Sequence, residues 1–173
     1  PVTAAPPTEA LAPLAHDERR LVTVLFGDVS GFTAMSEKLD PEQVKLIMDR
    51  CLKMLADQVV KFDGTVDKFE GDLIMAVWGA PVAHEDDAER AVLAALAMQE
   101  GLHAFAEDLQ RRRGFSLKMR IGINTGEVIS GAVASGRQKD YTVMGDVVNT
   151  ASRFEGAAEP GTVLVGTKTY ALT

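Results

Sequence analysis

The sequence predicts an α+β domain with a ferredoxin-like core, in which helices cover one face of a mostly antiparallel sheet. Two long segments, 41–62 and 84–113, repeat apolar residues every three or four positions, as amphipathic helices do. Short apolar runs rich in β-branched residues lie around them and are typical of strands. The resulting order, β-α-β-β-α-β with a further strand, helix and strand, favours this fold class.

The first predicted strand is the apolar run 21–26. We expect this strand to end at Gly27, so that Asp28 lies directly after its C-terminal end. A small turn at Ser30 and Gly31 then opens the next helix.

The middle of the chain predicts two long helices separated by a hairpin. The first helix begins at Pro41, runs to about residue 62 and is stopped by Gly64. The runs 65–69 and 72–78 form the hairpin, and the second helix covers about 84–113. Acids begin this second helix and arginines end it, which complements the helix macrodipole. We therefore interpret its acidic start, from His84 to Asp87, as capping residues rather than metal ligands, and its arginines as a solvated last turn rather than a phosphate site.

The C-terminal part predicts shorter elements. The runs 117–124 and 127–133 read as a strand pair around Thr125 and Gly126. A polar loop at 134–139 follows. After it we expect a strand at 140–144 and a helix from Gly145 and Asp146 to about residue 157. The last elements are a strand at 162–165 and a helix starting at Thr167.

Composition restricts the classes of function. With 173 residues, 46% of them apolar and 25% charged, the chain suits one globular domain, which we place at 19–173. Residues 1–18 are rich in proline and alanine, and we interpret them as a linker or the tail of an upstream region. The net charge of −7 argues against nucleic-acid binding, and no run approaches the roughly 18 apolar residues of a membrane span. The single cysteine, Cys51, excludes an internal disulfide and suits a reducing cytoplasm.

The first strand and turn are suited to holding a metal and a phosphate chain. The Asp28 carboxylate offers hard oxygen to Mg²⁺ or Mn²⁺, and the backbone amides of Gly31, Phe32 and Thr33 can point at anionic oxygens. From this stretch alone, an aspartate that merely caps the helix is an equal alternative. Asp72 opens the second arm of the hairpin, and the two strands are neighbours in a ferredoxin-like sheet. The two carboxylates can then share a pair of divalent ions about 3.5 to 4 Å apart.

Asn149 and Arg153 are spaced four residues apart, which places them on one face of the predicted helix. Together an amide and a guanidinium can orient a hydroxyl and stabilise charge on a phosphoryl group. By spacing alone, however, an ordinary exposed polar face is the better interpretation.

Four segments together resemble the consecutive signatures of a class III nucleotidyl cyclase catalytic domain, in family order, over about residues 21–173. They read FGDVSGFT, VDKFEGDLIMAVWG, GINTGEVISG and KDYTVMGDVVNTASRFE. The resemblance implies a nucleotide cyclase fold and conversion of ATP to 3′,5′-cyclic AMP and pyrophosphate. It also implies that the family domain usually continues past Thr173 with more sheet and a phosphate-binding lysine, so that the C-terminal part is truncated here.

The resemblance assigns a role to each matching position. It implies that Asp28 and Asp72 bind two divalent ions, with the Val29 carbonyl as a further ligand. Lys68 and Asp140 match the adenine-selecting pair, which suits the acceptor N1 and the donor amine of adenine. Asn149 matches the ribose-orienting asparagine and Arg153 the transition-state arginine.

The resemblance further implies a homodimer with two shared sites. Asp28, Asp72 and the Gly31 turn would come from one subunit and the remaining four side chains from the other, so a monomer should be inactive. Regulatory domains are expected in a longer chain. Two alternatives stay open, namely a non-catalytic nucleotide-binding or dimerisation module, and an enzyme that prefers GTP.

Overall fold

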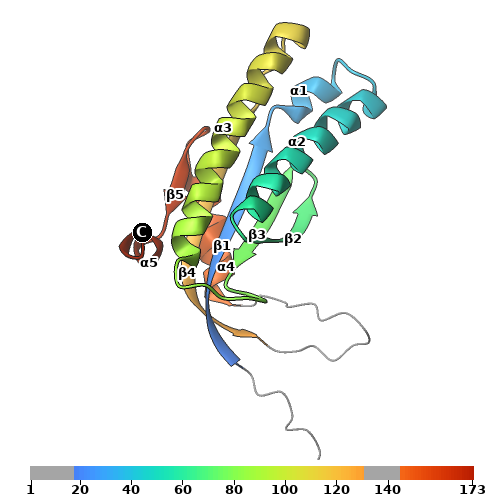
Figure 1. Cartoon of the computed structure of the whole chain (residues 1–173). Coiled ribbons are helices and arrows are strands. Elements are labelled where there is room, and N and C mark those ends of the chain that lie inside the picture. The colour runs from blue at the N-terminus through green and yellow to red at the C-terminus, as the bar shows by residue number, and fades with distance from the viewer. Residues whose placement is uncertain (1–17, 131–144) are drawn as a thin grey trace, which may run out of the picture.

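The computed structural model describes residues 18–130 and 145–173 (Figure 1). The predicted strand at 140–144, with Asp140, lies outside these ranges, and so does the predicted linker except for its last residue. The elements are β1 (Glu18–Ser30), α1 (Phe32–Ser36), α2 (Pro41–Lys61), β2 (Thr65–Glu70), β3 (Leu73–Trp78), α3 (Asp87–Arg113), β4 (Lys118–Ser130), α4 (Asp146–Ala157), β5 (Val163–Val165) and α5 (Thr167–Ala171).

The sheet has the strand order β2-β3-β1-β4-β5. All neighbouring strands are antiparallel except β4 and β5, which are parallel. The first four strands and the two long helices follow the β-α-β-β-α-β order of a ferredoxin-like core, in which a crossover helix follows β1 and another precedes β4. The predicted fold class is confirmed.

Helices cover both faces of the sheet, so the expectation of one covered face is wrong. Successive strand residues point to opposite faces. On one face, side chains such as Leu25 and Ile121 form a buried core with Leu55 of α2 and Met98 of α3. On the other face, a second buried cluster joins the sheet to α4 and consists of Val22, Val24, Phe26, Met75, Val77, Ala80, Val128, Val147 and Ala151. The prediction failed because the apolar stripe of α4 shows that this helix packs against the sheet but does not show which face of the sheet it covers.

β1 is longer than predicted. It continues past Gly27 to Ser30, so Asp28 lies within a paired strand rather than beyond its end. Asp28 is opposite Leu73 of β3 and Arg120 of β4. Pairing on both edges extends the strand through a glycine that the sequence alone marks as its end.

β4 is one continuous strand, which corrects the predicted strand pair. It pairs with β1 from Lys118 to Ser130 without a turn at Thr125 and Gly126. A Cβ atom at Gly122 would lie 2.1 Å from the backbone nitrogen of Glu155, and one at Gly126 would lie 2.6 Å from a Val147 methyl carbon. These glycines therefore allow α4 to approach the sheet, and neither makes a turn.

The other predicted elements agree closely with the structure. α2, the β2–β3 hairpin, α4 and β5 begin and end within about two residues of their predicted bounds, and α5 begins at Thr167 as predicted. α3 begins at Asp87, three residues later than expected. Asp87 lies in the first turn of α3, as predicted, and its carboxylate accepts a hydrogen bond of 2.8 Å from the His84 backbone N–H. The N-cap residue Asp86, however, makes no side-chain capping bond, so the predicted cap is wrong.

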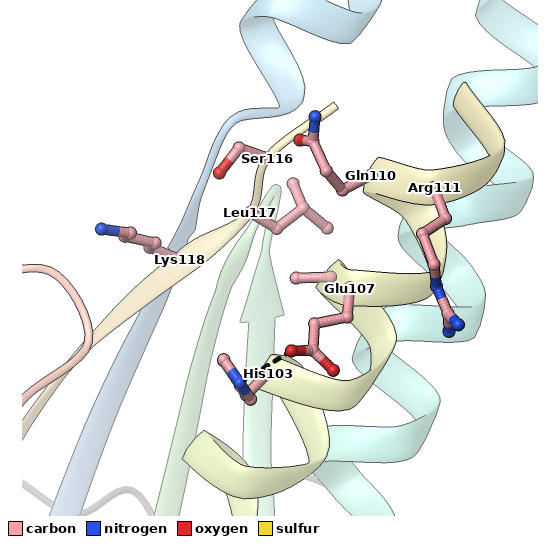
Figure 2. A pocket seen from close by; sticks show the side chains of 8 residues that line it. His103, Glu107, Gln110, Arg111, Ser116, Leu117 and Lys118 are labelled. Carbon is pink, nitrogen blue, oxygen red and sulfur yellow. Dashed lines mark ion pairs between the residues drawn. The ribbon is translucent and has the colours of Figure 1, made fainter. Parts of the chain in front are cut away.

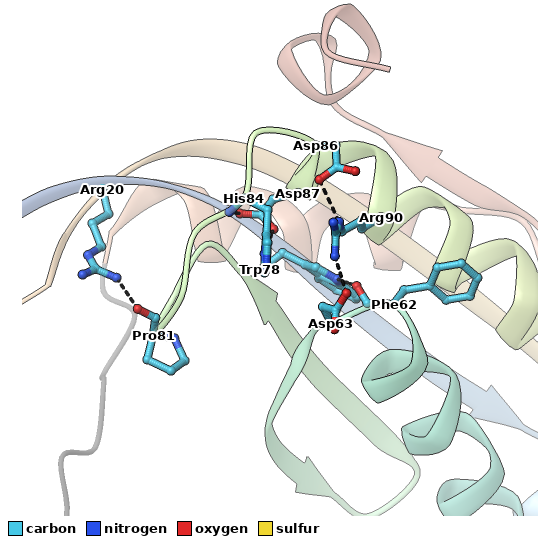
Figure 3. A network of polar contacts seen from close by, with 9 residues as sticks. All are labelled: Arg20, Phe62, Asp63, Trp78, Pro81, His84, Asp86, Asp87 and Arg90. Carbon is cyan, nitrogen blue, oxygen red and sulfur yellow. Dashed lines mark hydrogen bonds and ion pairs between the residues drawn. The ribbon is translucent and has the colours of Figure 1, made fainter.

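A polar network joins the start of α3 to the end of α2 (Figure 3). The Arg90 guanidinium pairs with Asp63 and, at 2.7 Å, with Asp86. Beside it, the Trp78 indole N–H donates a hydrogen bond of 2.9 Å to the Phe62 carbonyl oxygen. The network fixes both long helices relative to β3, which begins directly after Asp72.

Gly122→Ala tests the close approach of α4 to β4. The added methyl group meets helix backbone that cannot rotate away, so we expect a loss of roughly 1–3 kcal/mol in the free energy of unfolding, measured with urea. Gly156→Ala in α4 is the matched control because nothing lies within 4 Å of its added carbon. Equal stability of the two variants would contradict this role of Gly122.

Candidate active site

Asp28 and Asp72 come together where β1 passes the hairpin formed by β2 and β3. Asp72 lies between the two hairpin strands, and its backbone carbonyl accepts a hydrogen bond of 3.1 Å from the Val29 N–H. The amide and carbonyl of one strand residue point to the same edge, so the Val29 carbonyl faces this turn as well. We call the two carboxylates and this carbonyl the acidic cradle.

The carboxylates of the acidic cradle interact strongly. The pKa of Asp28 is raised from 3.8 to about 6, chiefly by burial and then by the charge and hydrogen bond of Asp72. Glu155 raises this pKa further, whereas Arg120 lowers it. Two carboxylates forced together in this way are stabilised by a cation between them.

The acidic cradle fits a hard divalent ion. Carboxylate and carbonyl oxygens are the ligands that Mg²⁺ and Mn²⁺ prefer. In the described ranges, no cluster of three or more His, Cys, Asp or Glu side chains is arranged to hold a metal. The remaining positions around an ion would be left to water and substrate oxygens, which suits catalysis better than a closed structural site.

The turn after β1 requires a glycine at position 31, where the phosphate-binding amides were predicted. Gly31 has φ 120°, and a Cβ there would lie 2.3 Å from the Ser116 carbonyl oxygen. Gly31 occupies the N-cap position of α1, so the alternative that Asp28 caps this helix is wrong. The first amides of a helix, here those of Phe32 and Thr33, have no acceptor within the helix.

The other described site residues, Lys68, Asn149 and Arg153, make no hydrogen bond or ion pair with the acidic cradle. Asn149 and Arg153 lie on α4 with exposed side chains. Lys68 of β2 is also exposed, and its ammonium group pairs with Glu70 at 3.0 Å. Asp140 lies outside the described residues. The structure therefore brings together only the predicted metal and phosphate half of the site.

The prediction from the sequence did not identify two residues near the acidic cradle, Arg120 and Glu155. Arg120 was missed because only the register of β1 and β4 shows that it faces Asp28. Glu155 follows Arg153 by two positions, but no sequence signal separates it from an exposed helix acid. Both residues change the pKa of Asp28, as described above.

A cavity of about 540 Å³ lies elsewhere, between the C-terminal part of α3 and the start of β4 (Figure 2). His103, Glu107 and Arg111 contribute to its lining from α3, and Lys118 does so from β4. None of the predicted site residues lines it. The Asp28 side chain instead lies on the face of the sheet that packs against α4.

The motifs and this geometry agree with a comparison against known families. Residues 14–173 match the family described as the adenylate and guanylate cyclase catalytic domain. The chain is a class III nucleotidyl cyclase domain. The predicted resemblance is confirmed.

Relatives of this cyclase domain include enzymes named for either nucleotide. Adenylate cyclase 1 of Rhizobium meliloti is 41% identical over 80% of the chain, and the receptor-type guanylate cyclase gcy-28 of Caenorhabditis elegans is 34% identical over 86%. The chain spans only 21% and 11% of the lengths of these two proteins.

Solved structures similar to the cyclase domain also cover both classes. The adenylyl cyclase CyaB of P. aeruginosa has a TM-score of 0.83 and 34% identity, with 91% of this chain and 82% of that chain covered. A guanylate cyclase domain of Catenaria anguillulae in complex with GTP has a TM-score of 0.77 and 28% identity, with 90% and 83% covered. A guanylyl cyclase domain of Blastocladiella emersonii, described as a non-canonical dimer, has a TM-score of 0.76 and 27% identity, with 90% and 86% covered.

Over residues 18–130 and 145–173 of the cyclase domain, no helix combines the length and the apolar character needed to cross a membrane.

Asp28→Asn tests whether the ionised Asp28 carboxylate destabilises the metal-free cyclase domain. Because the pKa of Asp28 is higher in the folded state, its ionisation destabilises the metal-free fold as pH rises from about 4 to about 6. We expect the variant to raise Tm at neutral pH by about 2–4 °C, a small effect because water screens the site. Thermal unfolding with a chelator measures this.

The gain in Tm should disappear at about pH 4, where Asp28 of the folded wild type is mostly protonated and resembles asparagine. A variant that is less stable than wild type at neutral pH would contradict the proposed repulsion.

Proposed function

We propose that this domain converts ATP into 3′,5′-cyclic AMP and pyrophosphate at two sites shared by a homodimer. The observation that carries the proposal is the division of the site residues within one chain. Asp28 and Asp72 interact with each other, whereas the described residues Lys68, Asn149 and Arg153 are exposed and make no hydrogen bond or ion pair with either of them. A second copy of the chain would supply what each acidic cradle lacks.

Asp28, Asp72 and the Val29 carbonyl would hold two divalent ions, Mg²⁺ or Mn²⁺. When bound, such ions lower the pKa of a coordinated hydroxyl and neutralise a polyphosphate. The amides of Gly31, Phe32 and Thr33 would hold phosphate oxygens at the beginning of α1. The fixed backbone of this turn would orient the triphosphate for in-line attack.

Lys68 of the partner subunit would recognise the base. Its ammonium group donates to N1 of adenine, and Asp140 of the partner subunit would accept a hydrogen bond from the exocyclic amine. Guanine presents a donor at N1 and an acceptor at O6, so it would leave both side chains unpaired. Support for ATP rests on these residue types, since the relatives include both cyclase classes.

The reaction forms one bond and breaks one. The ribose 3′-oxygen attacks the α-phosphorus, the bond to the bridging oxygen of the β-phosphate breaks, and pyrophosphate leaves. Asn149 of the partner subunit would orient the ribose, and Arg153 of the partner subunit would stabilise charge in the transition state. The hydroxyl proton passes to substrate or water.

The setting follows from the substrate and the composition. ATP, a single buried cysteine and a net charge of −7 suit a cytoplasmic enzyme without nucleic-acid partners. The much greater length of the relatives supports regulatory domains elsewhere in a longer chain.

A cyclase assay with Mg²⁺ and with Mn²⁺ tests the proposed function. We expect cyclic AMP from ATP, with kcat/KM for GTP lower by about 10²-fold or more because guanine leaves polar groups unpaired. Faster turnover of GTP would overturn the adenylate assignment. No cyclic nucleotide from either substrate, with either metal and with dimers demonstrated, would favour the non-catalytic alternative.

A further inference from the structure

α4 presents two different sets of functional groups. Asn149 and Arg153 are exposed, whereas Glu155, only two residues after Arg153, is half-buried. Residues two apart on a helix point in different directions. Arg153 therefore points outward while Glu155 points back toward the sheet of its own chain.

The backbone fixes Glu155 beside the acidic cradle. A Cβ at Gly122 would lie 2.1 Å from the Glu155 nitrogen, so α4 lies directly over that strand position. Arg120 is two residues earlier on β4 and therefore on the same face. It is also directly opposite Asp28 on β1. The close approach at Gly122 thus places the backbone of Glu155 near the neighbouring strand positions of Arg120 and Asp28.

The charges agree with this placement. Burial raises the pKa of Glu155 first, Arg120 lowers it, and Asp72 raises it. The Nε atom of Arg120 is buried and makes no hydrogen bond within the part of the chain that the structure describes. Glu155 is thus a third carboxylate near the acidic cradle, and Arg120 is the nearby cation that offsets part of their repulsion.

We propose that Glu155 is a positioning residue for the acidic cradle of its own chain, so that α4 serves both sites of the dimer. Asn149 and Arg153 of this helix act at the partner's cradle, while Glu155 adds negative charge at its own. This inference rests on the shared site of the proposed function. α4 then links the metal or substrate bound at its own cradle, through Glu155, to Asn149 and Arg153, which act at the partner's cradle.

Binding of Mn²⁺ alone tests the first part without reference to activity. The electron paramagnetic resonance signal of free Mn²⁺ would be followed as protein is added. Glu155→Gln removes one negative charge from the site, so we expect half-saturation to need roughly five- to tenfold more Mn²⁺. Glu155→Asp keeps the charge and should stay within about twofold of wild type. The exposed Glu159→Gln is the matched control and should bind as wild type does.

Unchanged Mn²⁺ binding by a folded Glu155→Gln protein would overturn the proposal, because a purely structural carboxylate would lower stability and leave metal binding alone. Equal weakening by Glu155→Asp and Glu155→Gln would also overturn it, because the charge would then not be the cause.

Mixed dimers show which site Glu155 serves. Asp72→Ala and Arg153→Ala chains, each inactive alone, should recover about a quarter of wild-type activity when mixed, because half of the dimers keep one intact site. This mixture tests the shared site itself. If it fails although heterodimers form, the proposed function is wrong whatever Glu155 does.

With that mixture active, Glu155→Gln is tested at limiting Mn²⁺, where it should be nearly inactive alone. If Glu155 serves its own cradle, this variant recovers activity with Arg153→Ala and none with Asp72→Ala. The reverse pattern would place Glu155 at the partner's cradle and overturn the inference, and so would recovery with both partners or with neither.

Discussion

β1 is paired along both edges as far as Asp28, which lies opposite Leu73 of β3 and Arg120 of β4. This register brings the residues of the acidic cradle together, because it places the strand carboxylate beside the hairpin turn that carries Asp72. The bond from the Val29 N–H to the Asp72 carbonyl holds that turn in place. A shift of one residue would turn Asp28 to the opposite face, into the core formed with α2 and α3.

The same register has an electrostatic consequence. Burial of Asp28, and then the charge of Asp72 beside it, raise the pKa of Asp28 to about 6, so the metal-free fold contains repulsion that a divalent ion would relieve. α4 approaches the sheet at Gly122, where Glu155 is half-buried and Arg153 is exposed. In the proposed function, this one helix therefore carries groups for both shared sites.

Much of this arrangement could be predicted from the sequence because long stripes and strand runs are local patterns. The two long helices, the hairpin and the proximity of Asp28 to Asp72 all follow from such patterns and from the strand order. The wrong predictions concern the role of glycines in β4 and the number of sheet faces that helices cover. In the sequence Gly126 is typical of a turn, but in the structure it allows α4 to approach β4. The apolar stripe of α4 predicts that this helix packs against the sheet, but it does not show against which face. Arg120 and Glu155 depend on register and packing across the chain, which no local pattern contains.

The central claim is that one chain holds only half of each site. It is tested most directly by measuring ATP turnover and sedimentation velocity over the same range of protein concentrations, with saturating Mn²⁺. The account predicts that turnover per chain rises in proportion to the fraction of dimer and approaches zero where the protein is monomeric. Constant turnover per chain at concentrations where only monomer sediments would contradict it.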